Sequence, residues 1–204
     1  SGKDILLAAS LPPLETSYRS DLILDSISMD SMYRELASIL ENNVDIIICE
    51  TMSHSAEARS ALAAIQNSNS QKWLGWTLYG NQNTLPSGET ITEAFNAVSD
   101  LKCDAYLINC GGVNLITEGI RELRSLTDKR IGGYGNSEKI EISKEDRSDR
   151  PEEDHWSSAT TITEREYAKE TQIWVEEGAT IVAGCCRTRP SHIKILAETF
   201  QENN

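Results

Sequence analysis

The chain has 204 residues, of which 32 are acidic and 19 are basic, so its formal net charge is −13. An acidic chain of this kind is a poor partner for nucleic acid or for an anionic membrane surface. No apolar stretch reaches the roughly 20 residues of a membrane span, and the length suits one domain, residues 1–204. The five cysteines are an odd number without the spacing of a secreted disulfide framework, which favours a reducing, cytoplasmic location.

Short apolar runs alternate with longer amphipathic segments along the whole chain. In chain order we expect a strand over 5–9, a helix over 29–43, a strand over 44–49, a helix over 54–67, a strand over 72–79, a helix over 89–100, a strand over 105–109, a helix over 115–125, a strand over 130–134, a helix over 163–177, a strand over 180–183 and a helix over 190–200. Regular alternation of apolar strands with helices is typical of a parallel sheet.

Three long connections follow predicted strands, and their position suits a functional role. Residues 11–26 are rich in proline, and residues 81–88 are polar. Residues 136–158 are strongly acidic, which indicates a solvated surface segment. No internal repeat or low-complexity tract stands out.

Cysteines stand at the ends of two predicted strands. Cys185 and Cys186 follow Gly184, a residue that allows a sharp turn, and adjacent cysteines do not readily form a disulfide with each other. Cys110 ends another apolar run. Three thiolates with one open position describe a catalytic zinc site rather than a magnesium or calcium site. Single cysteines such as Cys49 and Cys103 are more simply interpreted as small buried residues.

Five segments together resemble the homocysteine S-methyltransferase family, and they come in the family's order. They are the GCCRTRPSHI run at 184–193, the NC pair at 109–110, the strand with its ET end at 45–51, the YGNS run at 134–137, and the loop over 10–13 and 17–19. The double-cysteine run is the most specific of them.

The resemblance implies a TIM-type (β/α)8 barrel, whose active site lies at the carboxyl ends of its strands. It also implies zinc-dependent methyl transfer to the thiolate of homocysteine, giving methionine, from a small activated donor. Members of the family use S-adenosylmethionine, S-methylmethionine, betaine or a folate, and the resemblance leaves the donor open among these. Of the four, a sulfonium such as S-methylmethionine or S-adenosylmethionine is the expected donor. The implied zinc ligands are Cys110, Cys185 and Cys186, and Glu50 would bind the substrate ammonium group. Three further residues would line the substrate pocket: Asn109, Asn136 and Ser137.

The chain departs from the family in several ways. We count six βα units, whereas the family barrel has eight, and the first two strands have no counterpart. We therefore expect an incomplete barrel, a single N-terminally truncated domain over 1–204, whose open sheet edges could support a homo-oligomer. The alternatives are a barrel completed by a partner subunit and a reduced family member that closes differently. Ala183 and Gly135 stand where the family motifs have glycine and proline.

Two other classes of protein remain open at this point. One is a non-catalytic zinc-binding or assembly module derived from the same family. The other is a thiol redox protein, which is the weaker interpretation because the sequence contains no Cys-x-x-Cys spacing.

Overall fold

The structure, a computed structural model, describes residues 5–41, 43–79, 83–140 and 159–201. Six parallel strands form one sheet in the order β1-β2-β3-β4-β5-β8. Their bounds are β1 Ala8–Leu11, β2 Ile46–Met52, β3 Gln71–Trp76, β4 Ala105–Gly112, β5 Arg130–Asn136 and β8 Ile181–Gly184. A separate antiparallel pair joins β6 (Glu138–Ile140) to β7 (Ala159–Thr161). None of the described helices has the length and apolarity that a membrane crossing requires.

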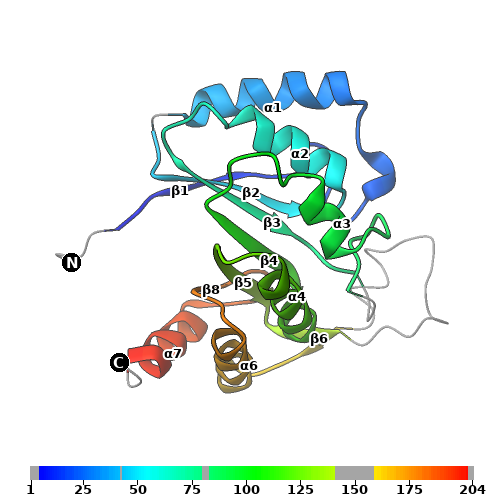
Figure 1. Cartoon of the computed structure of the whole chain (residues 1–204). Helices are drawn as coiled ribbons and strands as arrows, with labels where there is room; N and C mark the ends of the chain where they lie inside the picture. The colour runs from blue at the N-terminus through cyan, green and yellow to red at the C-terminus, as the bar shows by residue number, and fades with distance from the viewer. Residues whose placement is uncertain (1–4, 42, 80–82, 141–158, 202–204) are drawn as a thin grey trace.

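The helices follow the strands along the outer face of a curled sheet (Figure 1). They are α1 Ser26–Leu40, α2 Ser55–Ala64, α3 Ile91–Asn96, α4 Val113–Leu126, α6 Glu164–Glu176 and α7 Pro190–Gln201, with a 3-10 turn η1 at Ser20–Leu22. The described strands thus confirm six βα units with a parallel sheet. The edge strands are β1 and β8, so the sheet has the form of an incomplete barrel.

Both faces of the sheet carry buried apolar side chains, as expected for parallel strands covered by helices. The larger core lies between the strands and the helices and includes Trp76, Tyr167 and Trp174. A smaller cluster on the opposite, inner face is formed by Ile46, Trp73, Ala105, Leu107 and Tyr134. The inner face therefore has the apolar filling of a barrel interior.

Several predicted boundaries are wrong because local capping decides where an element begins. The helix expected over 29–43 begins at Ser26, since the Asp25 side chain accepts hydrogen bonds from the amides of Ile27 and Ser28. The helix expected over 89–100 covers only Ile91–Asn96, behind a capping box formed by Thr90 and Glu93. The first strand begins at Ala8 rather than at residue 5.

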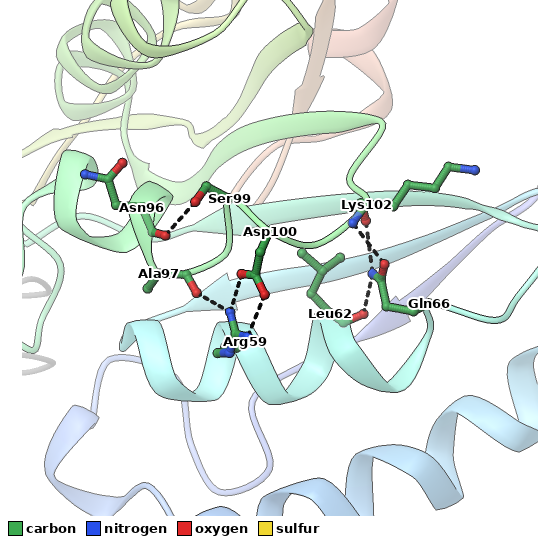
Figure 2. Close-up of polar contacts among 8 residues, drawn as sticks. All are labelled: Arg59, Leu62, Gln66, Asn96, Ala97, Ser99, Asp100 and Lys102. Atoms are coloured by element: carbon green, nitrogen blue, oxygen red, sulfur yellow. Dashed lines mark hydrogen bonds and ion pairs between the residues drawn. The ribbon is translucent and has the colours of Figure 1, made fainter.

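A polar clasp fixes α2 against the connection between α3 and β4 (Figure 2). The Arg59 guanidinium donates to both carboxylate oxygens of Asp100, at 2.6 and 2.8 Å, and to the Ala97 carbonyl at 2.6 Å. The Gln66 amide exchanges hydrogen bonds with the backbone of Lys102, at 2.9 and 3.0 Å. These contacts are exposed, so they determine how α2 is oriented more than they stabilise the fold.

The expectation that the acidic segment 136–158 is exposed to solvent is partly wrong. Its first three residues, Asn136, Ser137 and Glu138, are buried, and β6 pairs with β7, which begins just after the segment at Ala159. Residues 141–158, which carry most of its charge, lie outside the described residues. The buried beginning of this segment lies directly beside the cysteines.

Candidate metal centre

Three thiols meet at the carboxyl ends of β4 and β8. The Sγ atoms of Cys110, Cys185 and Cys186 all lie within 4.8 Å of one another, and those of Cys110 and Cys186 are 3.8 Å apart. Tetrahedral thiolate coordination with Zn–S bonds of about 2.3 Å requires S···S separations of about 3.8 Å. The predicted ligand set is thus brought together in a geometry that suits zinc.

Strand β5, which lies between β4 and β8, holds the ligand pair in place. The Cys185 amide donates to the Gly135 carbonyl at 2.8 Å, and the Cys186 amide donates to the Asn136 side-chain oxygen at 3.1 Å. On the other side, the pairing of β4 with β5 shifts register between Asn109 and Gly112. Cys110 lies inside that irregularity with φ of 57°, which turns its thiol toward the other two.

The neighbouring thiols disfavour ionisation of Cys185. The pKa of Cys185 lies well above its usual range, first because of the neighbouring thiols of Cys110 and Cys186 and then because of burial. Three adjacent thiolates need a cation to balance their charge, and sulfur ligands select a soft one. Three sulfur donors this close together are therefore better explained as a zinc site than as free thiols.

The other two cysteines behave as expected for structural residues. Cys49 and Cys103 are buried, and burial raises the pKa of both thiols, that of Cys103 to about 12. Among the described residues, neither belongs to the cluster of potential metal ligands. Both are protonated at neutral pH and contribute to packing.

Tyr18 is a member of the site that the sequence did not single out. Its hydroxyl donates to the Cys110 carbonyl oxygen and lies 3.1 Å from the Cys110 Sγ, although 92 residues separate the two. Burial, and then the proximity of Cys110, raises the pKa of Tyr18 above its usual range. The group therefore stays protonated and donates a hydrogen bond toward the sulfur of a candidate metal ligand. The sequence predicted a functional role for the loop over 11–26 as a whole, but only the fold shows that Tyr18 in this loop contacts Cys110.

Glu50 lies on the inner face of the sheet, as the alternation from Ile46 and Ile48 in β2 requires. Its carboxylate Oε2 accepts a hydrogen bond of 2.7 Å from the Tyr134 hydroxyl. Burial, and then Glu50, raises the pKa of Tyr134 well above its usual range, so the tyrosine remains the donor. The Glu50 side chain is half-buried and lies on the same face as Cys185.

The other three predicted substrate residues are buried and bonded within the protein. Asn109 exchanges hydrogen bonds with Thr51, at 3.0 Å to its amide and 2.7 Å to its hydroxyl. The Asn136 amide group bonds the Cys186 amide, as given above, and the Glu138 carboxylate at 2.9 Å. The Ser137 hydroxyl lies 2.8 Å from His192 Nε2 and donates to the Ile162 carbonyl at 3.1 Å. These side chains hold neighbouring strand ends in place.

Left-handed backbone conformations gather at this end of the sheet. Four non-glycine residues here have positive φ: Tyr18 at 70°, Thr51 at 62°, Cys110 at 57° and Arg187 at 61°. Such conformations are unfavourable for residues with a Cβ, and they are concentrated at functional sites. The carboxyl edge of the sheet is thus the place where the fold retains strain.

Comparisons with known proteins agree with this geometry. The sequence model of the family described as "Homocysteine S-methyltransferase" matches residues 2–200. "Homocysteine S-methyltransferase 1" from Brassica oleracea var. italica is 29% identical over 189 residues, covering 91% of this chain and 55% of the relative. "Selenocysteine Se-methyltransferase" from the same plant is 28% identical over 180 residues, covering 86% of this chain and 49% of the relative.

Among solved structures, the metallated form of the homocysteine methyltransferase MmuM from Escherichia coli superposes with a TM-score of 0.75 at 21% identity. That superposition covers 95% of this chain and 61% of MmuM. The chain thus spans about half to three fifths of the length of these relatives. With nearly its whole length matched, the chain belongs to the homocysteine S-methyltransferase family.

Proposed function

We propose that this chain carries the metal centre and part of the substrate pocket of a zinc-dependent homocysteine S-methyltransferase. The reaction moves a methyl group from an activated donor to the sulfur of homocysteine and gives methionine. The observation that carries the proposal is the cluster of three thiols within 4.8 Å at the carboxyl edge of a parallel sheet. Among the described residues the cluster has no fourth protein ligand, which leaves a coordination position for a substrate thiol.

Cys110, Cys185 and Cys186 would hold the zinc ion. When bound, zinc favours the ionised form of a substrate thiol and so supplies a nucleophile at neutral pH. The homocysteine sulfur then forms a bond to the methyl carbon as the bond from that carbon to the donor sulfur breaks. The thiol proton would pass to solvent before this step and the donor would leave as a neutral thioether, so no side chain would have to act as a general base in it.

Glu50 is the residue that we expect to contact the substrate. Its carboxylate would pair with the ammonium group of homocysteine, and Tyr134 would fix the orientation of that carboxylate through their 2.7 Å hydrogen bond. Asn109, Asn136 and Ser137 are buried, so we propose that they shape the pocket by supporting the strand ends behind it. Buried supporting residues of this kind hold the groups that contact the substrate in a fixed geometry.

A small sulfonium compound is the donor that we propose, either S-methylmethionine or S-adenosylmethionine. The plant relative named selenocysteine Se-methyltransferase supports a soft chalcogen nucleophile as the acceptor class, with homocysteine as the favoured member. We also propose a cytoplasmic location and association of two copies through the edge strands β1 and β8, because unpaired strand edges invite pairing.

Metal content and methyl transfer test the proposal in that order. The purified chain should contain about one zinc ion when prepared in reducing, metal-replete buffer, and Cys110→Ala or Cys185→Ala should abolish stoichiometric binding. Cys103→Ala is the matched control, because it removes a buried thiol outside the cluster and should leave the zinc content unchanged. Retention of zinc by Cys185→Ala would refute the ligand assignment.

Methyl transfer is then measured with homocysteine and each sulfonium donor. Formation of methionine only by the zinc-loaded chain supports the enzyme. Zinc binding without transfer from any donor would instead favour a non-catalytic zinc-binding module.

A further inference from the structure

Glu138 is a buried carboxylate whose two partners, Asn136 and Arg187, lie beside the cysteines of the thiol cluster. It begins β6, and its side chain is fully buried. Its Oε1 accepts a hydrogen bond of 2.9 Å from the Asn136 amide nitrogen. Its Oε2 lies 2.9 Å from the guanidinium of Arg187, the residue that directly follows Cys186.

The two partners of Glu138 are linked to the ligand loops, Asn136 by hydrogen bonds and Arg187 by directly following Cys186 in the chain. The Asn136 side chain accepts from the Cys186 amide at 3.1 Å and donates to the Cys110 carbonyl at 3.4 Å, so one amide group spans both loops. Arg187 takes a left-handed φ of 61° immediately after the ligand pair. The position of each ligand loop thus depends on a group that the Glu138 carboxylate holds.

A carboxylate is a costly group to bury, so its presence here calls for a physical reason. Removing a charge from water is repaid only when ion pairs and hydrogen bonds satisfy it, and an apolar residue would stabilise the fold as well or better. What an apolar residue could not do is accept a hydrogen bond from the Asn136 amide and form an ion pair with the Arg187 guanidinium at once. The arrangement therefore contributes orientation rather than stability.

We propose that Glu138 is a positioning residue for the metal centre, orienting the Cys110 and Cys185–Cys186 loops through Asn136 and Arg187. This inference rests on the proposed zinc site. Removing a group that hydrogen-bonds to metal ligands and fixes their orientation commonly lowers metal affinity by about 10–100-fold.

The test is the Co²⁺ affinity of the Glu138→Gln variant. Glutamine keeps the shape and one carbonyl oxygen, but its amide nitrogen would face the Arg187 guanidinium, donor against donor. Glu170→Gln is the matched control, because Glu170 forms a 2.7 Å ion pair with Lys139, the neighbour of Glu138, away from the thiols. Affinity is measured by competition with a chelator, and the visible absorption of the Co²⁺ form reports the number and geometry of its ligands.

We expect Glu138→Gln to bind Co²⁺ about 10–100-fold more weakly than the unmodified chain and with altered absorption bands. Glu170→Gln should stay within about twofold. Circular dichroism of the metal-free proteins shows whether each variant is folded. If Glu138→Gln does not fold, the Arg187→Lys variant tests the inference instead. Lysine keeps the positive charge but lacks the planar guanidinium group, so we expect it to bind Co²⁺ about tenfold more weakly.

Unchanged affinity and spectrum in the folded variant would overturn the inference, and so would an equal loss in Glu170→Gln. These outcomes are distinct from failure of the proposed function. If the unmodified chain itself binds no Co²⁺ or Zn²⁺, the metal centre is wrong and the role of Glu138 falls with it.

Discussion

Replacement of Asn109 by alanine tests whether the predicted substrate residues support the strand ends. The Asn109 side chain is fully buried, and its amide bonds the Thr51 backbone amide at 3.0 Å and the Thr51 hydroxyl at 2.7 Å. Thr51 directly follows Glu50 and has a left-handed φ of 62°. Asn109→Ala therefore removes both hydrogen bonds that hold Thr51 in this conformation.

The expected loss is about 1.5–4.5 kcal/mol of unfolding free energy. Leaving the buried Thr51 amide without a partner costs about 1–3 kcal/mol, and loss of the second hydrogen bond adds about 0.5–1.5 kcal/mol. No water replaces these bonds, because Asn109 and Thr51 are both buried. A domain stability of about 5–15 kcal/mol makes such a change easy to measure.

Urea unfolding, followed by tryptophan fluorescence, is the assay. Asn43→Ala is the matched control, since the Asn43 amide also makes two hydrogen bonds, to the carbonyls of Ile39 and Glu41, but on an exposed surface. Water replaces those bonds, so the control should change stability by no more than about 0.5 kcal/mol. Equal losses in the two variants, or a loss below about 1 kcal/mol for Asn109→Ala, would refute the supporting role.

Three further predictions follow from other contacts. Tyr18→Phe removes the hydroxyl that bonds Cys110 and should weaken zinc binding about tenfold in competition assays without unfolding the chain; unchanged affinity would count against that contact. Gly133→Ala should cost about 1–3 kcal/mol in urea unfolding, because its Cβ would lie 2.4 Å from the Ile116 Cγ2 atom of α4; a change under about 0.5 kcal/mol would contradict the packing. The hydrogen bonds from Arg59 lower the pKa of Asp100 to about 2, so Arg59→Ala should raise it toward 3.8 in an NMR titration. The stabilisation from that pair is present above the unfolded-state pKa of about 3.9 and is lost as pH falls through about 2; an unshifted pKa would refute the clasp.

Hydrophobic periodicity predicted all six strands of the main sheet and the helices that follow them, but not all of their ends. The apolar runs and amphipathic segments appear in the order expected. The errors come from side chains that bond backbone groups a few residues away, such as Asp25 before α1 and Thr90 before α3. Capping of this kind is a competition between neighbouring residues, which periodicity does not resolve.

The acidic segment after β5 shows a different limit. Its composition indicates solvent exposure, yet Glu138 is fully buried, with a hydrogen bond from Asn136 and an ion pair with Arg187 in place of water. Its guanidinium partner lies 49 residues further along the chain. Charge alone predicts exposure, and only a specific partner reverses that prediction.

The sequence by itself determined the parallel βα architecture, the family, and the three cysteines of the candidate metal centre. It could do so because the carboxyl ends of parallel strands meet at one edge, so residues that end strands are neighbours whatever the packing details. The tertiary structure decided that Tyr18 reaches Cys110 and that Asn109 and Asn136 support strand ends from buried positions. Those contacts join segments far apart in the chain, and their geometry depends on how the sheet curls and on which backbone groups remain to be satisfied.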